Sequence, residues 1–235
     1  MLPLPVSVPL LAIEASTTAG SVAIWVDGRL VGVEAVTMGA GQVDRLFPAV
    51  QRLVRGAELD PRSLGAVVCG GGPGSFTSLR IAAALAKGMA HGAGCSLFAV
   101  PSLLVAGAAV DPQRLPDRFV VHADALRGER YAQPLARLPD GRLDVAGPLA
   151  RVPLELLQAE VPAEARVAVL SSPLPDERHL VTPSIGLLAM IGGGWWETPV
   201  SLADWEPQYG RLAEAQVKWE ERHGMALPDA PLLRA

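Results

Sequence analysis

The sequence is poor in charged and aromatic residues, which limits what the chain can be. Of its 235 residues, 19% are charged and 5% are aromatic, whereas 50% are hydrophobic. A chain of this composition is not disordered, and it can bury a core in one large domain or two small ones. The formal net charge of −4, without any basic block, argues against a protein that binds RNA by itself.

Cysteine and histidine are also scarce. The two cysteines, Cys69 and Cys95, lie in apolar or glycine-rich stretches without the spacing of metal ligands, which is typical of reduced core thiols in a cytoplasmic protein. The four histidines are scattered, and no two of them stand four residues apart, the spacing that places two imidazoles on one helix face. The sequence therefore predicts no metal site.

Apolar runs that could cross a membrane are missing too. Residues 1–12 are apolar but hold three prolines and no basic start, which is not the pattern of a signal peptide. Residues 92–110 are uncharged, but Pro101 divides them into a predicted strand, Leu97–Val100, and a predicted helix, Ser102–Ala109. We therefore expect a soluble chain with no membrane partner.

The most informative stretch runs from Leu64 to Ala90 and reads as strand, glycine turn and helix. Ala66–Cys69 is a short apolar run that suits a buried strand. Gly70–Gly74, the glycine turn, is broken only by Pro73, and the helical pattern starts at Ser75 or Thr77. Serine and threonine are residue types that accept hydrogen bonds from free amides at a helix start.

Proteins also hold phosphate with this order of elements, but no generic phosphate motif fits. A P-loop needs Lys-Ser/Thr after its last glycine, where this chain has Ser75-Phe76. A dinucleotide fingerprint lacks its third glycine because Thr77 stands there, and the same residue excludes the nucleophile elbow G-x-S-x-G. The alternative is a tight strand-to-helix connection that uses glycine for its backbone freedom.

Residues 72–81, GPGSFTSLRI, resemble the GPGSFTGLRIG signature of the TsaB (YeaZ) family. The chain departs from that signature at Ser78 and Ala82, where the family has glycine. Two weaker matches follow: DALRGERY from Asp124, with Leu126 in place of the family's arginine, and a Pro-x-Tyr-x-Arg stretch from Pro207. Members of the family are the non-catalytic partner in the bacterial complex that makes threonylcarbamoyladenosine in tRNA.

The order of predicted elements in the first half agrees with the fold that this resemblance implies. Three strands are followed by a helix and then by alternating strands and helices; the first four elements are Leu10–Ala15, Gly20–Val26, Arg29–Val36 and Val43–Arg55. Asp27-Gly28 predicts a type I′ hairpin between the second and third strands. The resemblance implies an actin-like ATPase (ribonuclease H-like) fold, an α/β architecture of two subdomains with mixed sheets flanked by helices.

The proline-rich stretch from Asp111 to Asp117 predicts a boundary between residues 1–110 and a smaller C-terminal subdomain, 111–235. In the second part we expect a strand, a hairpin, two short helices and a final helix; these are Phe119–Ala123, Tyr131–Leu138 with Arg142–Ala146, Leu154–Glu160, Ser184–Ile191 and residues 211–222. The final helix is free to pack back on the first subdomain.

The resemblance also bears on cofactors. Nucleotide-using members of the superfamily carry an Asp-x-Gly-Thr-like phosphate loop, where this chain has Glu14-Ala15-Ser16-Thr17-Thr18 without a glycine. The catalytic paralog TsaD binds metal through two histidines, and Ser102 and Ala106 stand at the matching positions. We expect no metal, no catalytic residue and no cofactor bound by the chain alone, with ATP used only within the complex.

The family resemblance implies a scaffold whose helices 43–55 and 75–90 form a bundle with TsaD or with a second copy. The predicted partner interface consists of small residues bracketed by cations and of apolar residues on the first helix: Arg80, Ala83, Ala84, Lys87, Leu46 and Val50. The candidate functional residues of the glycine turn are Gly72, Gly74, Ser75 and Thr77. Expected partners are a TsaD-like paralog, a TsaE-like ATPase and tRNA through the complex, with a homodimer when the chain is alone.

Three alternatives stay open at this point. The alanines of the second helix could pack only on the chain's own sheet. An ATP-dependent small-molecule kinase of the same fold is a second reading, weakened by the altered loop at Glu14. The glycoprotease-like naming of this branch suggests a third, a hydrolase with a triad of Ser75, His122 and Asp124, although their spacing matches no nucleophile elbow.

Overall fold

The computed structural model describes residues 7–38, 45–169, 178–192, 194–209 and 222. Its first half is a five-stranded mixed sheet in the order β3-β2-β1-β4-β5. The antiparallel strands are β1 (Leu10–Glu14), β2 (Ala19–Val26) and β3 (Arg29–Thr37), and β4 (Ala66–Gly70) and β5 (Ser96–Val100) continue in parallel from β1. The predicted hairpin is confirmed, because Asp27 and Gly28 both have the positive φ, 50° and 71°, that a type I′ turn requires.

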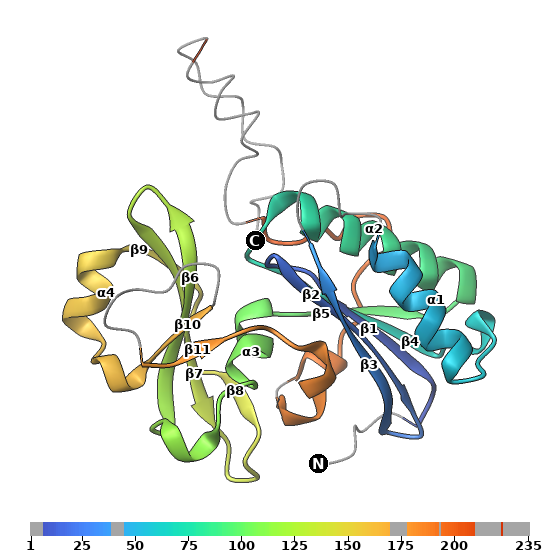
Figure 1. The fold of residues 1–235 in the computed structure, drawn as a ribbon, viewed down its shortest axis with the longest axis horizontal. Coiled ribbons are helices and arrows are strands. Elements are labelled where there is room, and N and C mark those ends of the chain that lie inside the picture. Colours follow the sequence, from blue (N-terminus) through green and yellow to red (C-terminus); the bar gives the residue numbers. More distant parts are fainter. Residues whose placement is uncertain (1–6, 39–44, 170–177, 193, 210–221, 223–235) are drawn as a thin grey trace.

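Helices α1 (Leu46–Gly56) and α2 (Phe76–Ala93) both cover one face of this sheet (Figure 1). Their apolar sides and the facing strands form one buried cluster, which includes Leu46, Val50, Ala82 and Ala86. The apolar sides of both helices thus pack on the chain's own sheet.

The second half forms a six-stranded sheet in the order β11-β10-β6-β7-β8, with β9 pairing to β7. Its strands are β6 (Arg118–Leu126), β7 (Glu129–Arg137), β8 (Leu143–Val145), β9 (Ala150–Pro153), β10 (Arg166–Val169) and β11 (Leu180–Val181). Helix α4 (Leu154–Glu160) packs on β7 and β9 and has the predicted bounds. Two mixed sheets flanked by helices are the predicted architecture, and it is confirmed.

The two sheets share a hydrophobic core. Helix α3 (Ser102–Gly107) lies between them (Figure 1), and all six of its residues are buried. One cluster of buried side chains includes Leu10 and Val68 of the first sheet, Leu104 of α3, and Val121 and Leu135 of the second sheet. Burial of α3 therefore joins the halves into one packed unit.

Some expectations for the second half were wrong or lie outside the described residues. The short helix expected at Ser184–Ile191 is present as a 3₁₀ helix, η5 (Ile185–Met190), and four of its six residues are buried, with contacts to the first sheet. Strands β9, β10 and β11 were not predicted, and α3 ends two residues early. The expected helix at 211–222 lies outside the described residues except for Arg222. In the described part of the chain, no helix is both long and apolar enough to span a membrane.

Candidate functional site

The glycine turn connects β4 to α2, as predicted, but its amides are already used within the chain. The Gly71 amide donates to the Val100 carbonyl at 2.7 Å, the Gly72 amide to Ser102 Oγ at 3.0 Å, and the Ser75 amide to the Ser16 carbonyl at 2.7 Å. A phosphate cradle needs such amides to be free to point at the anion. In this chain they stabilise the junction of β1, β4 and α3 instead.

The glycines of the turn are required by close packing. A Cβ at Gly72, whose φ is +87°, would collide with the Gln208 carbonyl, and one at Gly74 would collide with the backbone of Ser16. The space that a substrate phosphate would need beside the turn is therefore filled by the chain's own backbone. This supports the tight-connection reading that the sequence left open.

Glu14 lies at the centre of the same junction and is fully buried. Its Oε1 accepts the Ser16 amide at 2.6 Å and its Oε2 accepts the Ser102 hydroxyl at 2.8 Å. A Cβ at Gly70 would occupy the position of this carboxyl group, so glycine is needed there as well. Burial raises the pKa of Glu14, although the hydrogen bonds from Ser16 and Ser102 act against the shift.

The start of α2 differs from the prediction in one detail. Ser75 is the N-cap residue, but its side chain accepts no backbone amide; it is paired instead with the Ser78 hydroxyl at 3.1 Å. Thr77 is exposed. An N-cap side chain ordinarily accepts a backbone amide of the first helical turn. Here Ser75 Oγ accepts the hydroxyl of Ser78, the residue that replaces a glycine of the family signature.

Only some of the residues predicted for the partner interface are accessible in the structure. Arg80 and Ala84 are exposed on α2, and Lys87 is half-buried beside them. Ala83, Leu46 and Val50 are 5%, 0% and 1% exposed and belong to the chain's own core. As a correction, Leu46 and Val50 face the first sheet and cannot contact a partner, and Ala83 is likewise buried within the chain.

A segment that the sequence reasoning missed lies against α2. Residues 200–209, the strap, begin at the edge of the first sheet, where the Val200 amide donates to the Leu97 carbonyl at 2.8 Å. They end at the glycine turn, where the Gln208 amide donates to the Gly71 carbonyl at 2.8 Å. The Pro-x-Tyr stretch at Pro207 was the one sequence signal for it.

Aromatic rings link the strap to the cations of α2. The Lys87 ammonium lies 6.0 Å from the centre of the Trp205 ring. The Arg80 guanidinium lies 5.4 Å from the Phe76 ring centre, and that ring packs on Tyr209 with a centroid separation of 4.7 Å. Burial and the Glu206 carboxylate raise the pKa of Tyr209, whereas Arg80 acts in the opposite direction. These contacts hold both cations in place on the helix surface.

The residues of the imagined hydrolase triad are engaged elsewhere. His122 is buried in β6 of the second sheet, whereas Ser75 stands at the start of α2. Asp124 Oδ1 accepts the Leu126 amide at 2.8 Å and thus supports the β6–β7 turn. Within the described ranges, no three histidine, cysteine or acidic side chains gather as a metal site would require.

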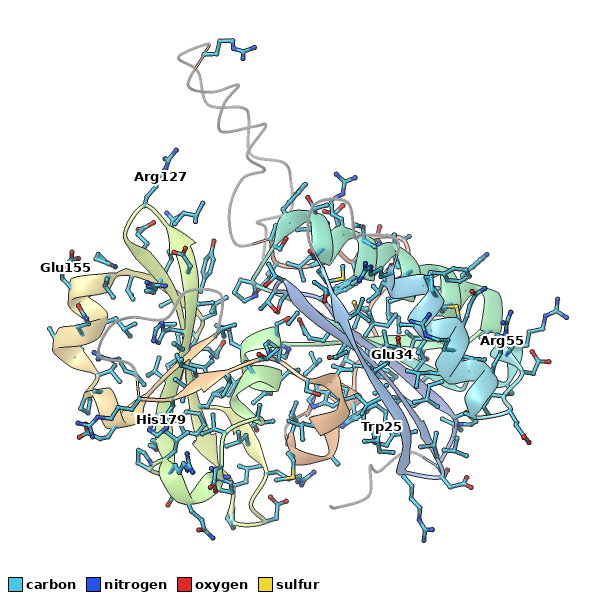
Figure 2. The ribbon with its side chains drawn as sticks, viewed as in Figure 1. Trp25, Glu34, Arg55, Arg127, Glu155 and His179 are labelled. Carbon is cyan, nitrogen blue, oxygen red and sulfur yellow. The ribbon has the colours of Figure 1, made fainter. Side chains whose placement is uncertain are left out.

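The tip of that hairpin carries the departure at Leu126. Leu126, Arg127 and Gly128 all have positive φ, between 53° and 78°. Leu126 is 46% exposed, and Arg127 projects from the tip (Figure 2). The arginine of the family pattern is therefore replaced here by an exposed apolar side chain.

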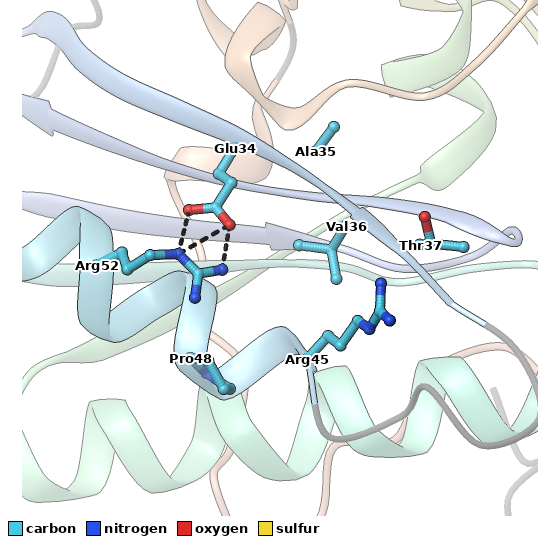
Figure 3. A pocket seen from close by; sticks show the side chains of 7 residues that line it. All are labelled: Glu34, Ala35, Val36, Thr37, Arg45, Pro48 and Arg52. Atoms are coloured by element: carbon cyan, nitrogen blue, oxygen red, sulfur yellow. Dashed lines mark hydrogen bonds and ion pairs between the residues drawn. The ribbon is translucent and has the colours of Figure 1, made fainter.

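A depression of about 370 Å³ lies between β3 and the start of α1 (Figure 3). Its lining is mainly polar and consists of Glu34, Ala35, Val36, Thr37, Arg45, Pro48 and Arg52. Glu34 and Arg52 neutralise each other in a paired hydrogen bond, with Arg52 Nε 3.1 Å from Glu34 Oε2. Glu34 and Arg52 are thus occupied by each other, and Arg45 is the other charged residue of the lining (Figure 3).

Comparison with known proteins agrees with this architecture. The family model "TsaD: tRNA N6-adenosine threonylcarbamoyltransferase" matches residues 40–181. The chain is 32% identical over 122 residues to the Escherichia coli "tRNA threonylcarbamoyladenosine biosynthesis protein TsaB", covering 52% of each chain. It is 25% identical over 227 residues to the Bacillus subtilis protein of that name, covering 90% of this chain and 98% of the relative.

The E. coli match thus spans about half the length of that relative. Among solved structures, YeaZ from Pseudomonas aeruginosa superposes with a TM-score of 0.69 at 27% identity, over 86% of this chain and 99% of that one. This neighbour confirms the expected fold. Because the family model covers more than half of the chain, from before the glycine turn to the end of β11, and the named relatives agree, the chain belongs to the TsaB (YeaZ) family.

Proposed function

We propose that the chain acts in tRNA threonylcarbamoyladenosine biosynthesis as a non-catalytic scaffold that pairs with and activates a TsaD-like catalytic subunit. The relatives' names supply the pathway. The observation that carries the scaffold role is the filled glycine turn: its amides at Gly71, Gly72 and Ser75 donate within the chain, and Gln208 and Ser16 occupy the space beside it. Such a turn positions α2 and does not bind a substrate phosphate.

The other components follow from what this chain lacks. With a net charge of −4 and no basic block, the chain reaches tRNA through its catalytic partner in the cytoplasm. A TsaE-like ATPase supplies nucleotide hydrolysis, so that ATP enters only within the complex. The threonylcarbamoyl group is then transferred to the adenosine beside the anticodon by the partner.

The outer side of α2 is the surface proposed for pairing. Ala84 is exposed, and a side chain at Gly88 would meet no atom within 4 Å, so another helix can approach closely there. Arg80 and Lys87 flank this open strip. Self-pairing of two copies through the same side is the competing arrangement.

The test is co-purification with the TsaD-like paralog after the change Ala84→Trp. We expect affinity to fall by about 10- to 100-fold, because the indole holds the helices apart. Ala159→Trp, at an exposed position of α4, is the matched control and leaves pairing unchanged. Undiminished pairing by a folded Ala84→Trp chain would contradict the interface.

The activating role is tested by reconstitution of tRNA modification with and without this chain. We expect threonylcarbamoyladenosine to form at a measurable rate only when the chain is present. Micromolar binding of Mg-ATP by the chain alone, measured by isothermal titration, would favour the kinase reading instead.

A further inference from the structure

The side chains of Arg80 and Lys87 lie on the same side of α2, and neither α1 nor α2 contains an acidic residue. Arg80 and Lys87 are seven residues apart, which in an α-helix is about 10.5 Å along the axis and about 20° around it. In the described part of the chain, neither side chain lies within ion-pair distance of a carboxylate. The exposed Ala84 lies between them.

The strap fixes the position of both cations. Lys87 lies over Trp205, and Arg80 lies over Phe76, which Tyr209 supports. The strap itself is anchored at Leu97 and Gly71 by backbone hydrogen bonds. Long cationic side chains lose much conformational freedom when they form an ion pair, so side chains that are already oriented bind with a smaller entropic cost.

The two helices contain no acidic residue. The segments Leu46–Gly56 and Phe76–Ala93 hold Arg52, Arg55, Arg80 and Lys87 but neither aspartate nor glutamate. A second copy that applied the same helices would therefore bring helix cations against helix cations, because the exposed Asp204 and Glu206 lie on the strap and not on the helices. Charge complementarity favours a different occupant.

We propose that this face, Arg80-Ala84-Lys87 with the open position Gly88, receives a helix of another protein that presents two carboxylates seven residues apart. Apolar side chains between those carboxylates would pack on Ala84 and Gly88. Phe76 of α2 and the strap residues Trp205 and Tyr209 are positioning residues for this contact. The inference rests on the proposed function, because it specifies the chemistry of the partner in that pairing.

A charge-reversed copy of this chain serves as a probe of that chemistry. The double change Arg80→Glu and Lys87→Glu places two carboxylates at the required spacing on a helix that keeps Ala84 and Gly88. We expect an equimolar mixture with the unchanged chain to associate about 3- to 30-fold more tightly than either chain alone in 50 mM NaCl, measured by sedimentation velocity. In 500 mM NaCl the difference should vanish.

A mixture that associates no more tightly than the separate chains would overturn the inference, as would an unchanged chain that self-associates equally well at low salt. This experiment needs no TsaD-like protein, so its failure is separate from failure of the proposed function. The double change Arg29→Glu and Arg118→Glu, at exposed positions away from α2, is the control and should give no mixed complex.

The contact with the catalytic partner is tested with the neutral double change Arg80→Gln and Lys87→Gln. We expect its affinity for the TsaD-like protein to fall about 3- to 30-fold at low salt, with a flatter dependence on salt concentration. If the neutral double variant keeps its affinity while Ala84→Trp loses pairing, the proposal of an acidic partner helix is wrong and the proposed interface on α2 still holds. If the unchanged chain does not bind the paralog at all, the proposed function and the inference both fail for that partner.

The strap is tested separately with Tyr209→Leu, which removes the ring behind Phe76 but keeps an apolar side chain. A positioning role predicts weaker pairing with a salt dependence that stays close to that of the unchanged chain, because both charges remain. A chain that retains full affinity after this change would exclude a positioning role for Tyr209.

Discussion

Glu14 shows how one side chain determines the character of the glycine turn. Its carboxyl group joins β1 to α3 through Ser102, whose hydroxyl also accepts the Gly72 amide. From the sequence, the glutamate at this position predicted an altered phosphate loop. The sequence did not indicate that the carboxyl would be buried, because the absence of a Cβ at Gly70 matters only once β1 and β4 are paired.

The first prediction concerns the pH dependence that this burial implies. Burial raises the pKa of Glu14 above its ordinary value near 4.5, so the folded chain retains a proton that the unfolded chain releases. This contribution to stability is complete below pH 4.5 and is lost as the pH rises through the raised pKa, with a slope of at most about 1.4 kcal/mol per pH unit.

The change Glu14→Gln mimics the protonated side chain and should remove this slope. We expect the free energy of unfolding, measured with urea between pH 5 and pH 8, to fall less steeply with pH in the variant than in the unchanged chain. The stability difference therefore shifts in favour of the variant as the pH rises. A difference that is constant over this range would show that Glu14 does not titrate in it.

At the scale of elements, the glycines of this chain fall into two kinds that the sequence does not distinguish. Gly74 approaches the Ser16 backbone so closely that no Cβ fits, whereas a Cβ at Gly88 in α2 would meet nothing within 4 Å. Both occur in the same glycine- and alanine-rich stretch. Their difference depends on the position of Ser16, which is more than fifty residues away in the chain.

The second prediction compares alanine at these two positions. Gly74→Ala should lower the free energy of unfolding by about 1–3 kcal/mol, because the added methyl group displaces Ser16 or the turn. Gly88→Ala should raise it by about 0.5–1 kcal/mol, because alanine restricts the unfolded chain and suits a helix interior. Urea unfolding followed by circular dichroism measures both; equal effects at the two sites would contradict the packing described.

Local signals were sufficient where the neighbours in space are also neighbours in sequence. Asp27-Gly28 predicted its hairpin, and Leu154–Glu160 was predicted to its ends. Leu46 and Val50 were recognised as an apolar stripe but assigned to the wrong contact, because periodicity shows that a helix has an apolar side and not what covers it. Strands β10 and β11 were missed because four and two residues carry too little periodicity.

At the scale of the whole molecule, the shared core couples the two sheets. Residues of β1, β4, α3, β6 and β7 belong to one buried cluster, although the composition of residues 111–117 suggests a boundary. The composition of residues 111–117 shows that this segment is polar and rich in proline, but not whether the two sheets pack on each other. That packing depends on α3, whose six residues are all buried. The Pro-x-Tyr stretch was a sequence signal for the strap but did not show where it packs, because its contacts at Gly71 and Leu97 join positions more than a hundred residues apart.

The third prediction follows from that coupling. Leu104→Ala, at a residue that is 1% exposed, should lower the free energy of unfolding by about 2–4 kcal/mol and should weaken both sheets together. Hydrogen exchange of amides in β2 and β7 measures this, and protection should fall by a similar factor in both strands. Leu156→Ala, at a residue that is 42% exposed on α4, is the control with a small effect. Loss of protection confined to one sheet would show that the halves unfold independently.

The hydrogen bond between Gln208 and Gly71 has a consequence for how the protein is made. As the chain emerges from the ribosome, the glycine turn is translated long before the residue that closes it. Until position 208 has left the exit tunnel, the Gly71 carbonyl and the aromatic support of Arg80 have no partner from the strap. The contact of Tyr209 with Phe76, and of the strap with the glycine turn, thus forms only after α2 itself has been translated.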